Sequence, residues 1–257
     1  MKPLLTAFIL LVVALTAQSA PEQSHSQIAR QNMPAIVAVN VLKKDGSTFT
    51  GTGFVLSEDG LIATNRHVLD NALYINITFP NSTVSGEAIL LAHDPQDLAL
   101  LKIEAHHLPH VLLGDSDTAQ PGQTITVIGN PRRLQNTVTS GLISQIRQQP
   151  DGTLWHQISA PISPSSSGSP VFDGQGRVIS IAFASMPGES NQNLNFAIPV
   201  NYLTDLIHQA GFSLPGMPDE QQTNAFLRHI QKSWEIVQRL WHRWFGKNPL
   251  ENPAPNS

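Results

Sequence analysis

The chain has 257 residues, a formal net charge of −4 and no cysteine. The small acidic excess gives no electrostatic basis for nucleic-acid binding, and the lack of cysteine excludes stabilisation by disulfides. Stability must therefore come from burial of an apolar core, for which a chain of this length is sufficient.

The first twenty residues, MKPLLTAFILLVVALTAQSA, have the composition of a secretory signal peptide. Their apolar run is about a dozen residues long, shorter than the roughly 20 residues of a membrane-spanning helix. Pro21 disfavours cleavage after Ala20, so we expect cleavage after Ala17 or Ser19. The sequence therefore predicts a signal peptide at residues 1–19 and export to the periplasm of a bacterial envelope or secretion. An uncleaved membrane anchor is the alternative.

From about residue 34 to 200, short β-prone segments alternate with turn residues. Their spacing of roughly 8–12 residues is typical of a sandwich or barrel rather than of a sheet with helical crossovers. The predicted strands are AIVAVNVL, GTGFVLS, LIATN, LYINITF, EAILLAHD, LALLKI, TITVIG, VTSGLIS, PVFD and VISIAFA. The polar stretch 115–122 is the predicted connection between two halves, and PVNYLTDLIHQAG predicts a short helix after the last strand.

A histidine follows two of these strands directly. In GTGFVLSEDGLIATNRHVLD, a turn at Glu58–Gly60 joins two β segments, and His67 comes after the second. A lone histidine is more often a surface or structural residue. Imidazole is nevertheless the usual base for a serine hydroxyl, so His67 is a candidate catalytic base where a carboxylate and a serine accompany it.

Two aspartates precede the apolar strand LALLKI. Asp97 comes directly before this strand, and a carboxylate at the start of a buried strand is well placed to orient an imidazole. Asp94, in HDPQD, is the rival, but its position is more typical of a turn residue. We therefore predict that Asp97 is the orienting carboxylate, with a structural role at the strand end as the alternative.

Three consecutive serines occur in SPSSSGSPVFD, residues 163–173. A serine hydrolase needs one activated hydroxyl, so Ser165, Ser166 and Ser167 compete for one role, and a serine-rich loop is the alternative. The order histidine, aspartate, serine is that of the chymotrypsin-type catalytic triad.

A cluster of histidines, HHLPH, contains His106, His107 and His110. It lies in a predicted surface loop without a supporting cluster of cysteine or glutamate, so we expect no metal and no other cofactor.

Together these motifs resemble the HtrA/Deg branch of the trypsin-like serine proteases, which have the chymotrypsin fold. The resemblance covers about residues 30–210 and rests on TNRHV, DLALLKI, LGDSDTAQPGQTITVIGNP, TVTSGLIS, SPSSSGSPVFDGQGRVISI and NFAIPVNYL in the family's order. It implies an all-β fold of two six-stranded antiparallel β-barrels with the active site in the cleft between them. The implied protease domain is 27–213, with barrels at about 27–114 and 118–205.

The resemblance also implies a role for each candidate. In the family, glycine, a small residue and proline follow the nucleophile, which selects Ser167 from the three serines. His67 would accept its proton, Asp97 would orient the imidazole, and the backbone N–H groups of Ser165 and Ser167 would form the oxyanion hole. The implied substrate-binding residues are Ile162, Ala182, Phe183 and Ala184. None is acidic, so we expect a preference for small to medium apolar side chains.

Two positions depart from the family pattern. At position 165 the family usually has glycine, and a serine at positive φ costs on the order of 1 kcal/mol. We therefore expect a less preorganised oxyanion hole, or one that forms with substrate. Ser166 stands where digestive trypsin-like enzymes have the aspartate that pairs with a new N-terminus, which excludes zymogen activation of that kind.

Beyond this domain, residues 218–246 have helical apolar spacing, and the PDZ domain that usually follows in the family is not expected. The apolar face consists of Leu227, Ile230, Trp234, Val237, Trp241 and Trp244. Five Lys or Arg against one Glu between residues 225 and 247 make the other face basic. The sequence predicts an amphipathic helix and a disordered tail at 247–257. The helix could dock on its own barrels or a sister subunit, form a coiled-coil homo-oligomer, or bind a membrane surface.

The sequence therefore predicts an exported serine endopeptidase that acts on proteins or peptides in envelope quality control or processing. Two alternatives remain. One is a weak or inactive scaffold protein that keeps the protease fold, for which Ser165 is the main support. The other is an esterase, which would use the same three residues.

Overall fold

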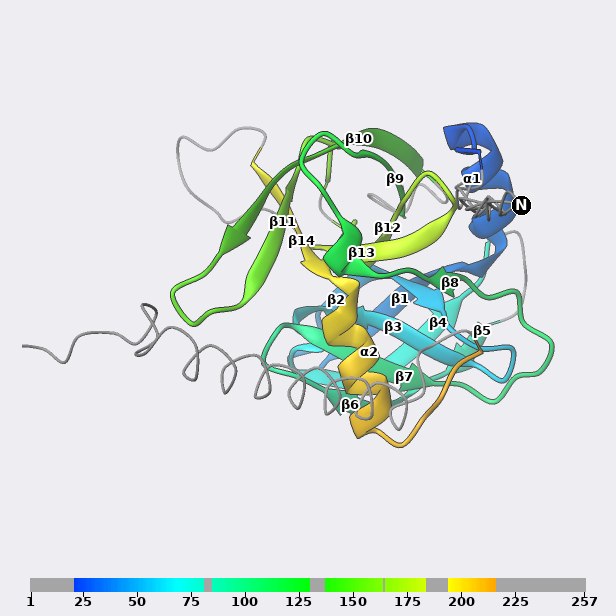
Figure 1. Ribbon diagram of the computed structural model, residues 1–257. Helices are drawn as coiled ribbons and strands as arrows, with labels where there is room; N and C mark the ends of the chain where they lie inside the picture. The colour runs from blue at the N-terminus through cyan, green and yellow to red at the C-terminus, as the bar shows by residue number, and fades with distance from the viewer. Residues whose placement is uncertain (1–20, 81–84, 130–136, 164, 184–193, 216–257) are drawn as a thin grey trace, which may run out of the picture.

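The computed structural model describes residues 21–80, 85–129, 137–163, 165–183 and 194–215. These residues form two sheets, one in the lower half and one in the upper half of Figure 1. The predicted signal peptide, the predicted helix at 218–246 and the tail lie outside the described residues.

The first sheet contains seven strands in the order β5-β4-β1-β2-β3-β7-β6, and every pairing within it is antiparallel. The strands are β1 (Ile36–Lys43), β2 (Thr48–Val55), β3 (Leu61–Asn65), β4 (Ala72–Thr78), β5 (Ser85–Glu87), β6 (Ile89–His93) and β7 (Leu98–Lys102). In β1 the alternation of apolar residues decides the faces, because Val37, Val39 and Val41 are buried while Asn40 and Leu42 face outward.

The second sheet also contains seven strands, in the order β12-β9-β10-β11-β14-β13-β8, and a further pairing of β12 with β13 closes it into a barrel. The strands are β8 (Leu112–Leu113), β9 (Thr124–Gly129), β10 (Thr137–Gln148), β11 (Leu154–Ile158), β12 (Ser169–Phe172), β13 (Arg177–Phe183) and β14 (Asn195–Pro199). Only β8 runs parallel to its neighbour, β13.

The predicted all-β fold with two barrels is confirmed, although each sheet has seven strands instead of six. In the first sheet, Ala88 interrupts one extended stretch and so separates β5 from β6. In the second, the two residues of β8, which precede the predicted connection at 115–122, add to the edge of β13. The predicted domain boundaries stay a prediction.

Three of the helical segments are short 3₁₀ helices, η1 (Met33–Ala35), η2 (Arg66–Leu69) and η3 (Ser116–Thr118). The short helix predicted after the last strand is α2 (Val200–Gln209), which Figure 1 shows in gold in front of the first sheet. The helix α1 (His25–Asn32) was not predicted from the sequence. It begins with a capping box in which Ser24 accepts from the Gln27 N–H and the Gln27 side chain accepts from the Ser24 N–H.

Helix α1 ties the first sheet to the second. Its Ile28 is buried in an apolar cluster that contains most of the first sheet's buried side chains, while Nδ1 of His25 lies 2.7 Å from Oγ1 of Thr126 on β9. Just before the helix, the Gln23 N–H donates to the Gly174 carbonyl at 2.7 Å, in the turn between β12 and β13. The segment before β1 therefore contacts both sheets.

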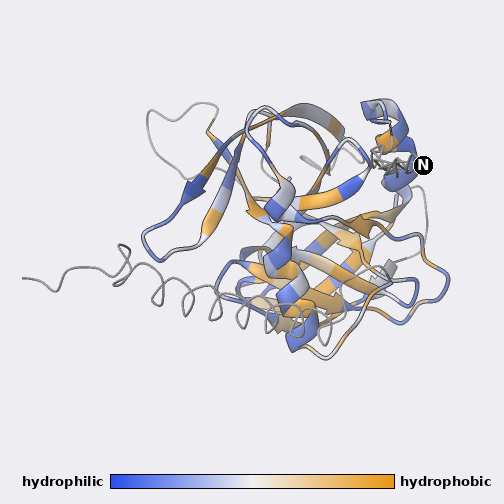
Figure 2. Cartoon of the chain, viewed as in Figure 1, coloured by the Kyte–Doolittle hydropathy of each residue, from blue (hydrophilic) through white to orange (hydrophobic). Residues whose placement is uncertain are grey.

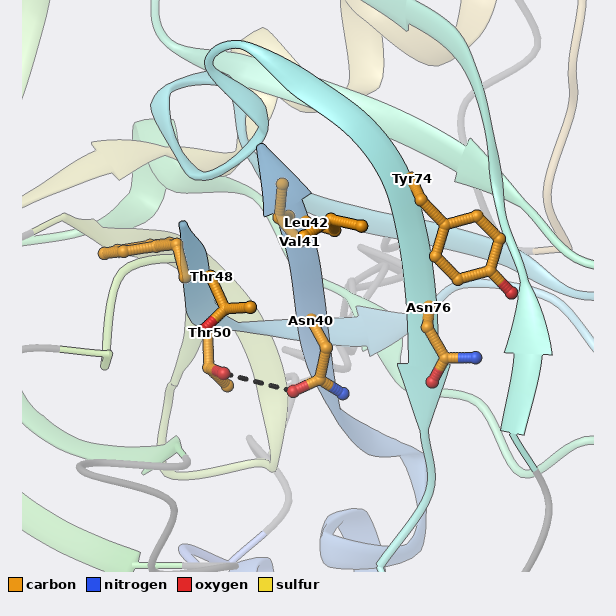
Figure 3. A pocket seen from close by; sticks show the side chains of 8 residues that line it. Asn40, Val41, Leu42, Thr48, Thr50, Tyr74 and Asn76 are labelled. Carbon is orange, nitrogen blue, oxygen red and sulfur yellow. Dashed lines mark hydrogen bonds between the residues drawn. The ribbon is translucent and has the colours of Figure 1, made fainter. Parts of the chain in front are cut away.

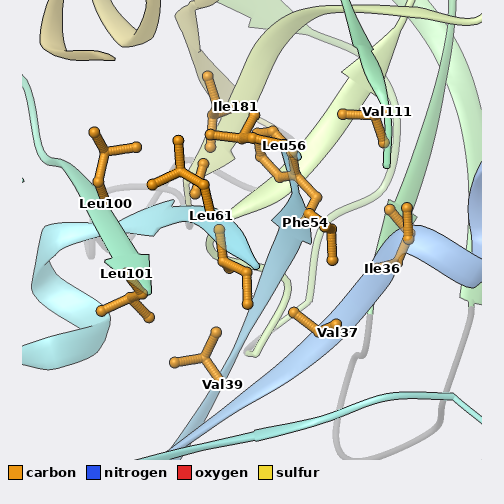
Figure 4. Close-up of a cluster of buried hydrophobic side chains, with 14 of the residues drawn as sticks. Ile36, Val37, Val39, Phe54, Leu56, Leu61, Leu100, Leu101, Val111 and Ile181 are labelled. Atoms are coloured by element: carbon orange, nitrogen blue, oxygen red, sulfur yellow. The ribbon is translucent and has the colours of Figure 1, made fainter. Parts of the chain in front are cut away.

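One apolar core extends across both sheets. Figure 2 shows the apolar residues concentrated on the strands of the first sheet, and Figure 4 shows Ile181 of β13 beside Phe54 and Leu56. The second sheet also contributes Phe172 of β12 and Ile198 of β14 to this core. Because apolar burial contributes about 25 cal/mol per Å², this shared core, which contains most of the buried Ile, Leu, Val and Phe side chains, is the main source of stability.

A separate core fills the second barrel and contains a buried polar pair. His156 of β11 and Ser180 of β13 are 1% and 0% exposed, and Nδ1 of His156 lies 2.6 Å from Oγ of Ser180. Strand β14 lies between β11 and β13, and its Ala197 pairs in register with His156. The small alanine side chain leaves room for the contact between His156 and Ser180. Burial lowers the pKa of His156 from 6.5 to about 4.

This burial predicts a loss of stability in acid. The unfolded chain takes up a proton at His156 below about pH 6.5, whereas the folded chain does so only near pH 4. The stabilising contribution is therefore complete above pH 6.5 and falls as the pH drops to 4, by about 3 kcal/mol. Urea unfolding of the wild type and His156→Gln between pH 7.5 and 4 measures this change in the free energy of unfolding.

The wild type should lose more unfolding free energy across this range than His156→Gln does. His93→Gln, which removes an exposed histidine from β6, is the matched control and should keep the wild-type dependence. Equal pH dependence in the wild type and His156→Gln would contradict this assignment.

Candidate active site

The structure brings His67 and Asp97 into direct contact. His67 lies in η2, immediately after β3, and Asp97 immediately precedes β7, the strand that pairs with β3. Nδ1 of His67 lies 2.6 Å from Oδ2 of Asp97, and the His67 N–H donates to Oδ1 at 2.8 Å. A carboxylate only accepts, so Nδ1 carries the proton and Nε2 is left as the basic nitrogen. The two side chains are 35% and 25% exposed.

The backbone of Asp97 is held in an uncommon conformation. Its φ of 66° lies in the left-handed region, which aspartate tolerates better than most residues. The Asp97 carbonyl accepts from the Arg66 N–H at 2.9 Å and from Nδ2 of Asn65 at 3.0 Å. Asn65 is fully buried and was not singled out in the sequence. These bonds fix the direction in which the Asp97 carboxylate points.

The rival carboxylate, Asp94, has a different partner. Its Oδ1 accepts from the Leu98 N–H at 2.8 Å, and its own N–H donates to the Leu98 carbonyl. Burial raises the pKa of Asp94, while the hydrogen bond from Leu98 opposes this. Asp94 therefore closes the turn before β7, as its position in HDPQD indicates.

The serine loop packs against the first sheet. The Ser167 carbonyl accepts from the Thr52 N–H at 2.9 Å, and the Ser165 carbonyl accepts from Oγ1 of Thr52 at 2.8 Å. Thr52 lies on β2, so these two bonds join the loop of the second sheet to a strand of the first. Ser167 is 2% exposed, in contrast to the half-buried Ser165.

Gly168 is the position at which the loop comes closest to the first sheet. Its φ is 87°, and a Cβ there would lie 2.0 Å from the Thr52 carbonyl oxygen and 2.6 Å from Oγ1 of Thr64. Only glycine fits both the conformation and the space. Thr64 is three residues before His67, near the end of β3, so the loop that carries Ser167 lies against the strand that leads into His67.

Ser165 adopts the conformation for which the family uses glycine. Its φ is 75°, and the Ser166 N–H donates to the Ser163 carbonyl at 2.9 Å, as in a tight turn. The Ser169 N–H donates to the Ser166 carbonyl at 3.0 Å. The N–H and the carbonyl of Ser166 are thus both hydrogen-bonded, which gives the loop the backbone order that an oxyanion hole requires.

The predicted substrate-binding residues lie in different environments. Ile162 is half-buried against the second core, and Ala182 is fully buried within it. The Ala182 carbonyl accepts from the Gly168 N–H at 2.9 Å, so its backbone supports the serine loop. Phe183 is half-buried, with its ring 5.0 Å from that of Trp155 and 6.2 Å from that of Phe196. Ala184 lies outside the described residues.

No metal-binding arrangement is present in the described part of the chain, where no three His, Cys, Asp or Glu side chains are grouped as ligands. His110 of the HHLPH cluster instead has Nδ1 3.3 Å from the Leu108 carbonyl. A depression of about 200 Å³ is lined by residues of β1, β2 and β4, and none of the triad candidates lines it (Figure 3).

The left-handed backbone at position 165 predicts that two small substitutions differ in their effect on stability. Ser165→Gly removes the steric cost of a Cβ at positive φ, whereas Ser165→Ala retains it. We expect the glycine variant to be more stable than the alanine variant by about 1 kcal/mol in urea unfolding. An alanine variant that equals the glycine variant in stability would contradict a strained residue 165.

Comparison with known proteins gives a family match over the same residues. A family model described as the trypsin-like peptidase domain matches residues 51–181, which include His67, Asp97 and Ser167. The putative serine protease HhoB of Synechocystis sp. is 38% identical over 158 residues, 59% of this chain and 38% of the relative. A probable periplasmic DegP-like serine endoprotease of Marinomonas sp. is 38% identical over 164 residues, 62% and 35% of the two chains.

Solved structures agree with these relatives. An HtrA-type protease, AlgW with a tripeptide, superposes with a TM-score of 0.67 at 30% identity, over 73% of this chain and 63% of that chain. The chain spans little more than a third of the length of the two curated relatives named above. The chain belongs to the trypsin-like peptidase family, and its homologues are proteases of the HtrA/DegP type.

Proposed function

We propose that this protein is an exported serine endopeptidase that uses His67, Asp97 and Ser167. The observation that carries the proposal is the contact between Nδ1 of His67 and Asp97 at 2.6 Å. The Ser167 loop packs on Thr52 of β2, which pairs with the strand that leads into His67. A histidine oriented in this way offers Nε2 to a hydroxyl, and that use requires a nucleophile beside it.

The proposed reaction follows from the protonation state of the imidazole. Nε2 of His67 accepts the proton of the Ser167 hydroxyl as Oγ attacks the scissile carbonyl, and the backbone N–H groups of Ser165 and Ser167 stabilise the oxyanion. The imidazolium, held by the Asp97 carboxylate, then protonates the leaving amine. Water deacylates Ser167 by the same proton transfers in reverse order.

The proposed substrates are proteins or peptides of the bacterial envelope, in quality control or defined processing. Relatives are named periplasmic serine endoproteases, and HtrA-type neighbours were solved with a tripeptide or a decapeptide. We propose the periplasm or secretion as the location, on the basis of the predicted signal peptide at 1–19 and these names.

The carboxylate assignment predicts different results for two aspartates. Asp97→Asn tolerates the left-handed backbone but presents an amide to Nδ1, which favours the wrong tautomer and should lower turnover by roughly 10³–10⁴-fold. Asp94→Asn keeps an acceptor for the Leu98 N–H, so it should retain turnover close to that of the wild type. Hydrolysis of fluorescein-labelled casein measures both.

The assignment would be contradicted if the wild type hydrolysed casein and Asp94→Asn lowered turnover more than Asp97→Asn. A wild type without hydrolysis, at a concentration at which the pure protein is folded, would instead support the inactive scaffold. The observation that favours the scaffold is the serine at φ 75°, in the oxyanion loop.

Specificity follows from the absence of acidic side chains among the proposed pocket residues. Because Ile162 and Phe183 are apolar, we propose a preference for small to medium apolar residues before the scissile bond. Cleavage-site sequencing on a peptide library should show valine, alanine or similar residues there. Cleavage only after lysine or arginine would contradict this pocket.

We further propose that residues 218–246 form a contact segment for the protein's own barrels, a sister subunit or a membrane surface. No helix in the described part of the chain is long and apolar enough to cross a membrane. On the first sheet, β6 has three consecutive exposed apolar residues, Ile89, Leu90 and Leu91. This exposed apolar surface supports docking of an apolar helix face there.

Deletion of residues 218–257 distinguishes these contacts. Docking on the protein's own barrels predicts a lower melting temperature for the deletion variant, with equal sedimentation with anionic liposomes before and after deletion. Membrane binding predicts sedimentation of the full chain only, and subunit contact predicts a change in mass by light scattering. A deletion that alters none of the three measurements would contradict the contact segment.

A further inference from the structure

Thr52 is the residue that joins the serine loop to the first sheet through a side chain. It lies in the middle of β2 and is fully buried. Its Oγ1 donates to the Ser165 carbonyl at 2.8 Å, its N–H donates to the Ser167 carbonyl at 2.9 Å, and its carbonyl accepts from Oγ1 of Thr64 at 2.7 Å. One rigid strand position therefore holds two carbonyls of the loop.

These bonds act on the strained part of the loop. The Ser165 carbonyl belongs to the peptide unit between residues 165 and 166, whose N–H is held by the Ser163 carbonyl. Both ends of that peptide unit are thus fixed, which restricts ψ of Ser165. A serine at φ 75° is displaced towards negative φ by its Cβ, and the bond from Oγ1 of Thr52 opposes that displacement.

We propose that Thr52 is a positioning residue that keeps the Ser165 N–H directed to the oxyanion and compensates for the missing glycine at position 165. This inference rests on the proposed protease function. In this role Thr52 acts through the backbone of the serine loop and not on the reacting atoms. It determines instead how often the loop has its oxyanion donors in place, so its loss should lower kcat more than it raises KM.

The test compares two threonines on the same strand face. Thr52→Val keeps the shape of the side chain but removes Oγ1, whereas Thr52→Ser keeps the hydroxyl. Thr50→Val is the matched control, because Oγ1 of Thr50 donates to Oδ1 of Asn40 on β1 at 3.1 Å (Figure 3). Ser165→Gly, alone and combined with Thr52→Val, tests the coupling.

With a fluorogenic peptide that has valine before the scissile bond, Thr52→Val should lower kcat about tenfold with little change in KM. Thr52→Ser and Thr50→Val should stay close to the wild type. Ser165→Gly should restore part of the loss in the Thr52→Val background, because glycine holds positive φ without help. Equal kcat for Thr52→Val and Thr50→Val, or no restoration by glycine, would overturn the proposal.

Hydrogen exchange tests the same inference without turnover. The Ser166 N–H, bonded to the Ser163 carbonyl, should exchange faster in Thr52→Val than in Thr50→Val, while the core amides of β7 keep their protection. Unchanged exchange at Ser166 would overturn the role of Thr52 even in an inactive protein. Failure of the wild type to hydrolyse any peptide, with faster exchange in Thr52→Val, would count against the protease function alone.

Discussion

The apolar core that the two sheets share determines where the parts of the candidate site meet. Ile181 of β13 packs with Phe54 and Leu56 of the first sheet, so the second barrel is fixed against β2 and β3 (Figure 4). Only with this docking can a loop of the second sheet reach Thr52. Because apolar burial is large but non-directional, hydrogen bonds across the interface are needed to set the final geometry.

Three backbone positions of the site have positive φ, and each is held by strands rather than by solvent-exposed loops. Asp97 is fixed through its carbonyl by the end of β3, Ser165 through its carbonyl by β2, and Gly168 by contact with both strands. The cost of such strain is on the order of 1–3 kcal/mol at a non-glycine residue and is offset by the rigid surroundings. The candidate site therefore combines strained backbone positions with rigid surroundings.

Much of the fold could be predicted from sequence, because an alternating or continuous run of apolar residues is a local pattern that indicates a strand. β8, β11 and β14 were not among the predicted strands, and in β11 the polar residues His156 and Gln157 interrupt the apolar run. Helix α1 was missed although its capping box is visible in sequence. The contact of His67 with Asp97 followed from motif order, whereas the roles of Thr52 and Asn65 depend on pairings between segments distant in sequence, which no local pattern indicates.

The most direct test of the account is labelling of the mature protein with a fluorophosphonate, followed by mass spectrometry to locate the adduct. The reagent phosphonylates a serine only where a base and an oxyanion site activate its hydroxyl. An adduct is expected on Ser167, with none on Ser165 or Ser166, and it should be lost in His67→Ala. A folded wild-type protein that forms no adduct, or one that forms it equally in His67→Ala, would contradict the account.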